Sequence, residues 1–162
     1  MATVNNNLSE YDITQVPDGK SMKIGIVVSE WNEEITKGLL NGAHSTLLKH
    51  GILEENIIVQ FIPGSFELPL AAQWLLEHTE VDSVICLGSV IRGETAHFDY
   101  VCSGVSQGIK EVSLKYSKPV IFGVLTDDNI EQSRARSGGI HGNKGDEAAV
   151  TAIKMLGLRS KY

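Results

Sequence analysis

The sequence predicts one doubly wound α/β domain, in which four parallel strands form a sheet with helices on both faces. Four short apolar runs rich in β-branched residues recur along the chain, at 23–29, 57–62, 83–88 and 119–125. Runs without polar alternation are typical of strands buried on both faces. Segments of helical periodicity separate the runs, and right-handed crossovers place such helices on both faces of a parallel sheet. The 162 residues fit a single core, so the chain is expected to be one domain, 1–162.

The first helix is expected after Asn32, a residue type that caps helices, with Glu33 and Glu34 in the first turn and Gly51 as the stop. A second helix is predicted over 66–78, where Pro69 is tolerated in the first turn. Asp127 or Asp128 is expected to cap a short fourth helix. Apolar stripes at helical spacing mark the third helix and the last one: Val101, Val105, Ile109, Val112 and Tyr116, then Ala148, Ala149, Ala152, Ile153 and Leu156.

Composition excludes several classes of partner. The formal net charge of −6 disfavours nucleic acid and anionic membranes. No apolar run reaches the length of a membrane span, and residues 1–12 lack the features of a signal peptide, so a cytoplasmic location is expected. Cys86 and Cys102 have no metal-ligand spacing and are expected to be reduced, buried thiols. Residues 1–17 form a polar arm that is either frayed or paired as an edge strand with a neighbouring subunit.

Chemistry-bearing residues follow three of the predicted strands. In an open parallel sheet, ligands bind beyond the carboxyl ends of the strands. Trp31 offers a flat face for a heteroaromatic ring, although plain packing is the commoner use of tryptophan. The segment 92–95, Arg-Gly-Glu-Thr, stands at a strand-to-helix junction where backbone amides and the Thr95 hydroxyl can hold a phosphate, with the Glu94 carboxylate turned to solvent. His97 is a candidate proton carrier because imidazole titrates near neutrality; a merely exposed histidine is the alternative.

Near the C-terminus, Arg134 and Arg136 precede a glycine-rich segment, and either guanidinium suits a phosphate. The sequence contains no GxxxxGK[ST], GxGxxG or HExxH motif. Triphosphate hydrolysis, dinucleotide binding and zinc proteolysis therefore lose their usual support.

Several motifs occur in order along the chain: Trp31-Asn32, PGSFELP at 63–69, GSVIRGETAHFDYV at 88–101, PVIFGVLT at 119–126, and RSGG and GNKGDE at 136–147. Together they resemble the motifs of the lumazine synthase family, from about residue 22 to the C-terminus. The resemblance implies a flavodoxin-like, three-layer α/β/α fold. It also implies condensation of 5-amino-6-(D-ribitylamino)uracil with 3,4-dihydroxy-2-butanone 4-phosphate to 6,7-dimethyl-8-ribityllumazine, phosphate and water. No metal or organic cofactor is implied.

The resemblance also assigns roles to individual residues. His97 matches the proton donor, and Lys144 matches a lysine near the substrate carbonyl. Residues matching the phosphate site are Glu94, Thr95 and Arg136, rather than Arg134. Residues matching the site of the pyrimidine and its ribityl chain are Trp31, Ser65, Phe66, Glu67, Ser89, Val90 and Ile91.

Phe122 matches a residue that covers the site of the adjacent subunit, which implies a homopentamer at least. Relatives with a short glycine loop often assemble twelve pentamers into an icosahedral 60-mer, with riboflavin synthase as an open further partner. Here Ile140 and His141 replace the usual lysine-containing pair and remove a positive charge. A flavin-binding flavodoxin-like domain, or a catalytically silent flavin- or lumazine-binding shell of the same fold, is the alternative function.

Overall fold

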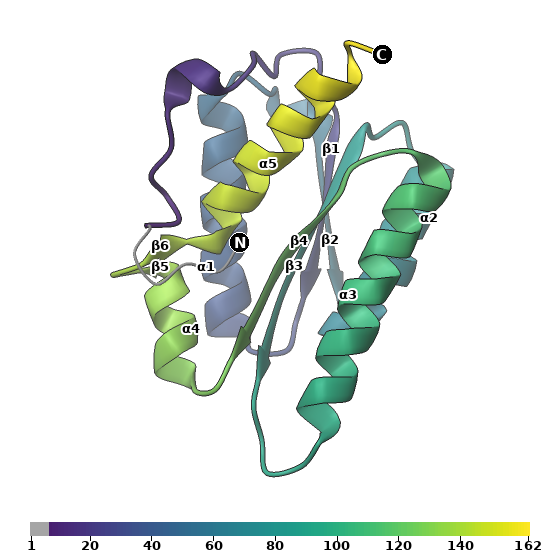
Figure 1. Ribbon diagram of the computed structural model, residues 1–162. Helices are drawn as coiled ribbons and strands as arrows, with labels where there is room; N and C mark the ends of the chain where they lie inside the picture. The colour runs from purple at the N-terminus through teal and green to yellow at the C-terminus, as the bar shows by residue number, and fades with distance from the viewer. Residues whose placement is uncertain (1–6) are drawn as a thin grey trace.

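A four-stranded parallel sheet forms the centre of the protein, in the order β2-β1-β3-β4. The computed structural model describes residues 7–162 (Figure 1). The strands are β1 (Ile24–Ser29), β2 (Ile57–Ile62), β3 (Ser83–Ile91) and β4 (Val120–Asp127). β3 and β4 run beyond their apolar runs because they pair with each other as far as Ile91 and Asp127. The predicted parallel sheet is confirmed.

Helices cover both faces of this sheet and complete a three-layer α/β/α arrangement, as predicted. α1 (Glu33–Lys49), α4 (Ile130–Arg136) and α5 (Lys144–Arg159) lie on one side. α2 (Leu68–His78) and α3 (His97–Tyr116) lie on the other (Figure 1). Shorter elements join them: the 3-10 turns η1 (Ile13–Gln15), η2 (Glu54–Asn56) and η3 (Ser65–Glu67), and the antiparallel pair β5 (Ser137–Gly139) and β6 (Gly142–Asn143).

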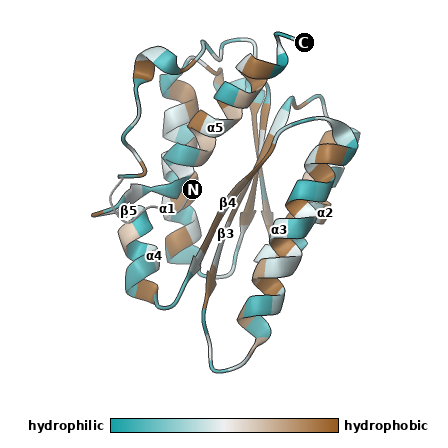
Figure 2. Ribbon diagram, in the orientation of Figure 1, coloured by the Kyte–Doolittle hydropathy of each residue, from teal (hydrophilic) through white to brown (hydrophobic). Residues whose placement is uncertain are grey.

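The core consists of two apolar layers, one on each face of the sheet. Ile26 and Val28 of β1 pack toward α1 and α5, whereas the intervening Val27 packs toward α2 and α3. Every residue of β1 is buried, which is the outcome expected for a strand between two helical layers. Figure 2 shows hydrophobic strands between helices of mixed polarity, and α1, α2, α3 and α5 each turn an apolar stripe inward.

Cys86 is buried in β3 as predicted, whereas Cys102 in α3 is only half-buried, and both are free thiols. Burial raises the pKa of both thiols above the ordinary range, so both favour the protonated form. Among residues 7–162, no helix is long and apolar enough to span a bilayer.

The described part of the N-terminal arm, from residue 7 onward, lies on its own chain. The Leu8 amide donates to the His141 carbonyl, and the Asn143 amide donates to the Ser9 hydroxyl. The Tyr11 hydroxyl lies 3.0 Å from Nε2 of His50 at the end of α1. Residues 1–6 of the predicted arm lie outside the described residues. Pairing of the arm with a neighbouring subunit stays a prediction.

The cap of α4 differs from the prediction. Asn129 caps this helix, since its side chain accepts from the Gln132 amide at 3.0 Å. Asp127 still belongs to β4, and its carboxylate accepts from the Ser133 hydroxyl at 2.8 Å. Asp128 instead accepts from Arg92. The capping position moved along the chain because strand pairing with β3 continues through Asp127.

A glycine permits the close packing of α1 against α5. A Cβ atom on Gly145 would lie 2.0 Å from the Leu39 carbonyl oxygen and 2.8 Å from the Ala43 amide nitrogen. These are backbone atoms of α1, which cannot yield without moving the helix. Contact of the two backbones therefore depends on the absence of a side chain at residue 145.

Replacement of Gly145 by alanine is expected to lower the free energy of unfolding by about 1–3 kcal/mol, because α1 and α5 must separate. Gly93 is the matched control, since a Cβ there meets nothing within 4 Å. The Gly93→Ala variant should stay within about 0.5 kcal/mol of the parent protein. Urea unfolding followed by circular dichroism measures both. Equal stabilities of the two variants would contradict the packing argument.

Candidate active site

The loops after β1, β2 and β3 meet at one rim, the lower end of the sheet in Figure 1. We call the segments 30–32, 63–67 and 92–97 the rim loops. β1 and β2 end level with each other, with Ser29 beside Ile62. The Glu30 amide continues the ladder by donating to the Ile62 carbonyl at 2.8 Å. The Ser65 hydroxyl, buried at the start of η3, donates to the Ser29 hydroxyl at 3.4 Å.

Two aromatic side chains stand exposed on the rim. Trp31 is 73% exposed and Phe66 is 59% exposed. The Phe66 ring lies against Gly104 of α3, where a Cβ atom would approach it to 2.6 Å. Trp31 does not contribute to the core of this chain, so plain packing within the chain does not explain it. Exposed flat faces beside buried hydroxyls are suited to a ring that carries polar substituents.

Asn32 connects the first rim loop to β3. Its backbone is left-handed, with φ 60° and ψ 50°, and its side chain makes no capping bond to α1. The side-chain amide instead donates to the Ser89 carbonyl at 2.9 Å. Asn32 occupies the predicted capping position, but the predicted capping role of its side chain is wrong. Its left-handed backbone turns the chain directly after Trp31, and its amide fixes that turn to the adjacent strand.

The end of β3 supplies the polypeptide next to this connection. Ser89 is buried within the strand, and its hydroxyl makes no hydrogen bond to the described residues. Val90 and Ile91, the last two strand residues, are half-buried and pair with Thr126 and Asp127. The strand therefore carries the predicted pyrimidine-contacting residues to the rim.

The third rim loop leads into α3. Residues 92–97 are all exposed, including Glu94, Thr95 and His97. The Thr95 hydroxyl accepts from the His97 amide at 3.4 Å, and Ala96 at the N-cap provides no side-chain cap. The N-terminal end of a helix carries partial positive charge and unpaired amides, which favour an anion. The structure thus brings the predicted phosphate-binding loop and the predicted proton carrier together.

Three predicted site residues lie away from this rim. Phe122 stands five residues before the end of β4, about 16 Å at the rise of a strand. Arg136 ends α4, six residues or about 9 Å beyond the start of that helix. Lys144 begins α5, whose next residue packs against Leu39 in the second turn of α1. Within one chain, the hydrogen bonds of Arg136 and Lys144 go to Gln132 and Glu147, which are not rim-loop residues.

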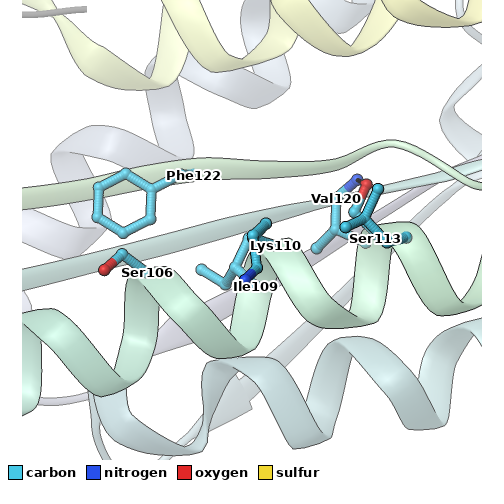
Figure 3. Close-up of a pocket in the computed structure, with 7 residues that line it drawn as sticks. Ser106, Ile109, Lys110, Ser113, Val120 and Phe122 are labelled. Carbon is cyan, nitrogen blue, oxygen red and sulfur yellow. Dashed lines mark hydrogen bonds between the residues drawn. The ribbon is translucent and has the colours of Figure 1, made fainter.

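Each of the three has its own surroundings. Phe122 lines an open groove of about 340 Å³ between β4 and α3, with Ser106, Ile109, Lys110, Ser113, Leu114 and Val120 (Figure 3). The Arg136 guanidinium donates to the Gln132 carbonyl at 2.9 Å. Lys144 Nζ donates to Glu147 Oε1 at 2.8 Å. Arg134, the other candidate arginine, makes a two-pronged ion pair with Glu34 at 2.8 and 2.9 Å.

The rim itself is acidic. The rim loops carry the carboxylates of Glu30, Glu67 and Glu94 and one cation, Arg92. Arg92 is held by Asp99 at 3.3 Å and Asp128 at 3.0 Å. A phosphate at the rim therefore requires positive charge from elsewhere. Among residues 7–162, no group of three His, Cys, Asp or Glu side chains is arranged to hold a metal ion.

Comparison with known proteins gives the same assignment as the motifs. Residues 21–160 match the family model described as 6,7-dimethyl-8-ribityllumazine synthase. The chain belongs to this family. A relative of that name from Parabacteroides distasonis is 62% identical over 156 residues, which cover 96% of this chain and 98% of the relative. Those from Cytophaga hutchinsonii (60% over 156 residues; 96% and 98% covered) and Porphyromonas gingivalis (56% over 158; 98% and 98%) carry the same name.

Two contributions to the geometry of this family site were missed from the sequence. Asn32 was expected only as a cap, and Arg92 was expected only as part of a phosphate loop. The position of Asn32 directly after a loop tryptophan could have indicated a left-handed turn, because asparagine tolerates the left-handed region of backbone conformation. The partners of Arg92 lie 7 and 36 residues away, so no local pattern indicated them.

Asn32 allows a separate measurement of backbone strain and of its side-chain connection. Asn32→Ala should lower the free energy of unfolding by about 2 kcal/mol, from left-handed strain plus a lost hydrogen bond. Asn32→Gly removes only the bond and should cost about 1 kcal/mol less than Asn32→Ala. Ser117, at φ 49° in the C-cap of α3, is the control. Ser117→Gly should not destabilise the protein. Chemical denaturation of the three variants tests this, and an Asn32→Gly variant as stable as the parent would contradict the connection.

Proposed function

We propose that this chain condenses 5-amino-6-(D-ribitylamino)uracil with 3,4-dihydroxy-2-butanone 4-phosphate to form 6,7-dimethyl-8-ribityllumazine, phosphate and water. The observation that carries the proposal is the shared rim, where an exposed tryptophan and an uncapped helix start are brought to one end of the sheet. The first suits a pyrimidine ring, and the second suits a phosphate. Membership of the family makes this reaction the one that the site supports best.

In the proposed reaction, most of the catalysis comes from placing two substrates side by side. The pyrimidine stacks on Trp31, and its ribityl chain lies along Ser65, Phe66 and Glu67. Backbone groups of Ser89, Val90 and Ile91 hold the edge of the uracil ring. This arrangement presents the free amino group to the ketone of the second substrate, with which it forms a Schiff base as water leaves.

The phosphate of the second substrate lies at Thr95 and at the backbone of Glu94, whose carboxylate stays in solvent. Loss of phosphate and closure of the second ring both require proton transfers. His97 is the proposed proton donor, because its imidazole is exposed at the start of the same helix. Its position beside the phosphate loop allows it to reach the leaving group and the carbonyl oxygen.

We further propose that a second copy of the chain completes each site. Within one chain, Arg136 and Lys144 bond to Gln132 and Glu147, and Phe122 lines the groove between β4 and α3. An acidic rim that lacks a free cation is matched by Arg136 and Lys144 of a neighbour. Each completed site would then contain an aromatic cover, Phe122, and a cationic clamp from the adjacent subunit.

Apolar surface on two opposite sides of the sheet supports a ring. β2 and β4 are the edge strands. On the β2 side, Phe61 is exposed, and Trp74 of α2 is 54% exposed. On the β4 side, the groove with Phe122 is bordered by Leu114, which is 72% exposed (Figure 3). Two different apolar sides are suited to head-to-tail contacts, which form a ring when the rotation between neighbouring copies closes. Further proposals from the sequence accompany this arrangement. They are a pentamer, a 60-mer of twelve pentamers, association with riboflavin synthase and a cytoplasmic location.

Replacement of Arg136 by alanine is expected to raise the KM for the phosphate substrate about 30-fold, equivalent to about 2 kcal/mol of a lost charge-assisted pair. The KM for the pyrimidine should change little. Arg134→Ala is the control, because Arg134 is paired with Glu34 and has no proposed substrate contact. Steady-state kinetics with each substrate varied in turn gives the answer. An unchanged KM for the phosphate substrate in Arg136→Ala would reject this assignment.

Replacement of His97 by alanine is expected to lower kcat by at least about tenfold, less than many acid–base residues contribute, because the attacking amine is already nucleophilic. His78→Ala serves as the control, since His78 is also exposed but lies at the C-terminal end of α2. Lumazine formation followed by absorbance measures both variants. A His97→Ala variant with full kcat would make His97 a bystander.

The same absorbance assay on the unaltered protein tests the reaction itself. Product formation from the two substrates supports the proposed function. Lumazine binding without product formation would instead favour the catalytically silent binding shell.

Light scattering in the same buffer measures the mass of the assembly and separates a pentamer from a 60-mer. A monomeric protein that is fully active would reject the shared site.

A further inference from the structure

Arg92 connects three elements at the rim without a role in the reaction described above. Its backbone amide donates to the Asp127 carbonyl at 2.9 Å and so extends the pairing of β3 with β4. Its Nε donates to Asp128 Oδ1 at 3.0 Å, and its Nη1 donates to Asp99 Oδ1 at 3.3 Å. Its guanidinium carbon lies 4.1 Å from the centre of the Phe98 ring. One side chain thus contacts the end of β4 and the first turn of α3.

These contacts lie on both sides of the exposed phosphate loop. Between Arg92 and α3, residues 93–96 are exposed, and a Cβ on Gly93 would meet nothing within 4 Å. The packing of the loop itself therefore does little to fix its course. Phe98 and Asp99, the two residues after His97, are held by Arg92 from the other end. The position of the His97 imidazole depends on the same helical turn.

The energies involved favour a geometric role over a stabilising one. Arg92, Asp99 and Asp128 have side chains that are 44%, 62% and 69% exposed. Ion pairs at such positions contribute about 0–1 kcal/mol to stability. A planar guanidinium that is bonded along two edges and stacked on a ring has a fixed orientation, which a lysine ammonium cannot reproduce.

Direct binding of the substrate phosphate by Arg92 is disfavoured by its partners. Asp99 and Asp128 together outweigh the single positive charge of Arg92. A phosphate that approached the guanidinium would meet two carboxylates at the same place. The cation is therefore engaged in holding protein groups, and its partners make the cluster anionic.

We propose that Arg92 is a positioning residue for His97. It fixes the first turn of α3 against the end of β4, so that the imidazole stays in reach of the reacting groups. The inference rests on the proposed function. It assigns to Arg92 an effect on kcat that is exerted through His97, and no contact with either substrate.

The kinetic test uses Arg92→Gln and Arg92→Lys. Arg92→Gln should lower kcat about tenfold, which is within the roughly 100-fold that a misplacement of about 1 Å can cost. Arg92→Lys keeps the charge and should not restore the rate. Asp99→Asn and Asp128→Asn should each lower kcat in the same direction, while the KM for the phosphate substrate stays within about twofold. Restoration of kcat by lysine, or a rise confined to the KM for phosphate, would overturn the proposal.

A double-mutant cycle tests the dependence on His97. In a His97→Ala background, Arg92→Gln should lower kcat by less than about twofold, because the group that it positions is absent. An undiminished loss in that background would overturn the proposal. Lys23→Gln is the matched control, since Lys23 also has a side chain that is 44% exposed and ion-paired, at the opposite end of the sheet. Its kcat should equal that of the parent protein.

Hydrogen exchange gives a readout that does not depend on activity. In Arg92→Gln, peptides covering residues 93–99 should exchange faster than in the parent protein, whereas Lys23→Gln should leave them unchanged. Unchanged exchange in Arg92→Gln would overturn the positioning role. If the unaltered protein forms no lumazine, while Arg92→Gln still shows the faster exchange, the proposed function is rejected and the structural effect of Arg92 stands.

Discussion

The burial of a parallel sheet on both faces is the constraint on which the rest of this structure depends. A strand such as β1, buried along its whole length, requires a helical layer on each side. Each helix must then return the chain to the end of the sheet at which the parallel strands begin. All strands consequently end at one rim, which is why the three rim loops lie together although their first residues, 30, 63 and 92, are far apart in the sequence. The site is a product of this topology before any side chain is considered.

The rim follows from the sheet topology, but it lacks the positive charge that a phosphate requires. Its loops carry aromatic faces and carboxylates, and its one cation is committed to two aspartates. Arg136, the predicted phosphate-binding arginine, and Lys144, the lysine predicted near the substrate carbonyl, each have their own partner within the chain. This separation is the basis of the proposal that two subunits share each site. The apolar surface on opposite sides of the sheet is consistent with that proposal.

Packing contacts in the core and polar contacts at the rim contribute to different properties of the protein. Gly145 matters because a displaced helix disturbs two packed backbones, and the cost is one of stability. Asn32 and Arg92 hold loops that lack a core of their own, and each reaches across the rim to a neighbouring strand or helix. Both residues select one loop conformation out of many. The exposed ion pairs of Arg92 contribute little free energy, so loss of function with little loss of stability is expected for Arg92, whereas replacement of Asn32 also lowers stability.

Local periodicity was sufficient for the sheet, the order of helices and the rim, because burial imposes its pattern on neighbouring residues. The runs at 57–62 and 83–88 and the helix after Asn32 were predicted in place, and the motifs identified the family. Tertiary structure alone decided that β3 and β4 extend to Ile91 and Asp127, that Asn129 caps α4, and that Asn32 bonds to Ser89. It also decided the surroundings of Phe122, Arg136 and Lys144 within the chain. These outcomes depend on which distant groups become neighbours, and a hydrogen bond between residues 57 positions apart leaves no periodic trace in the sequence.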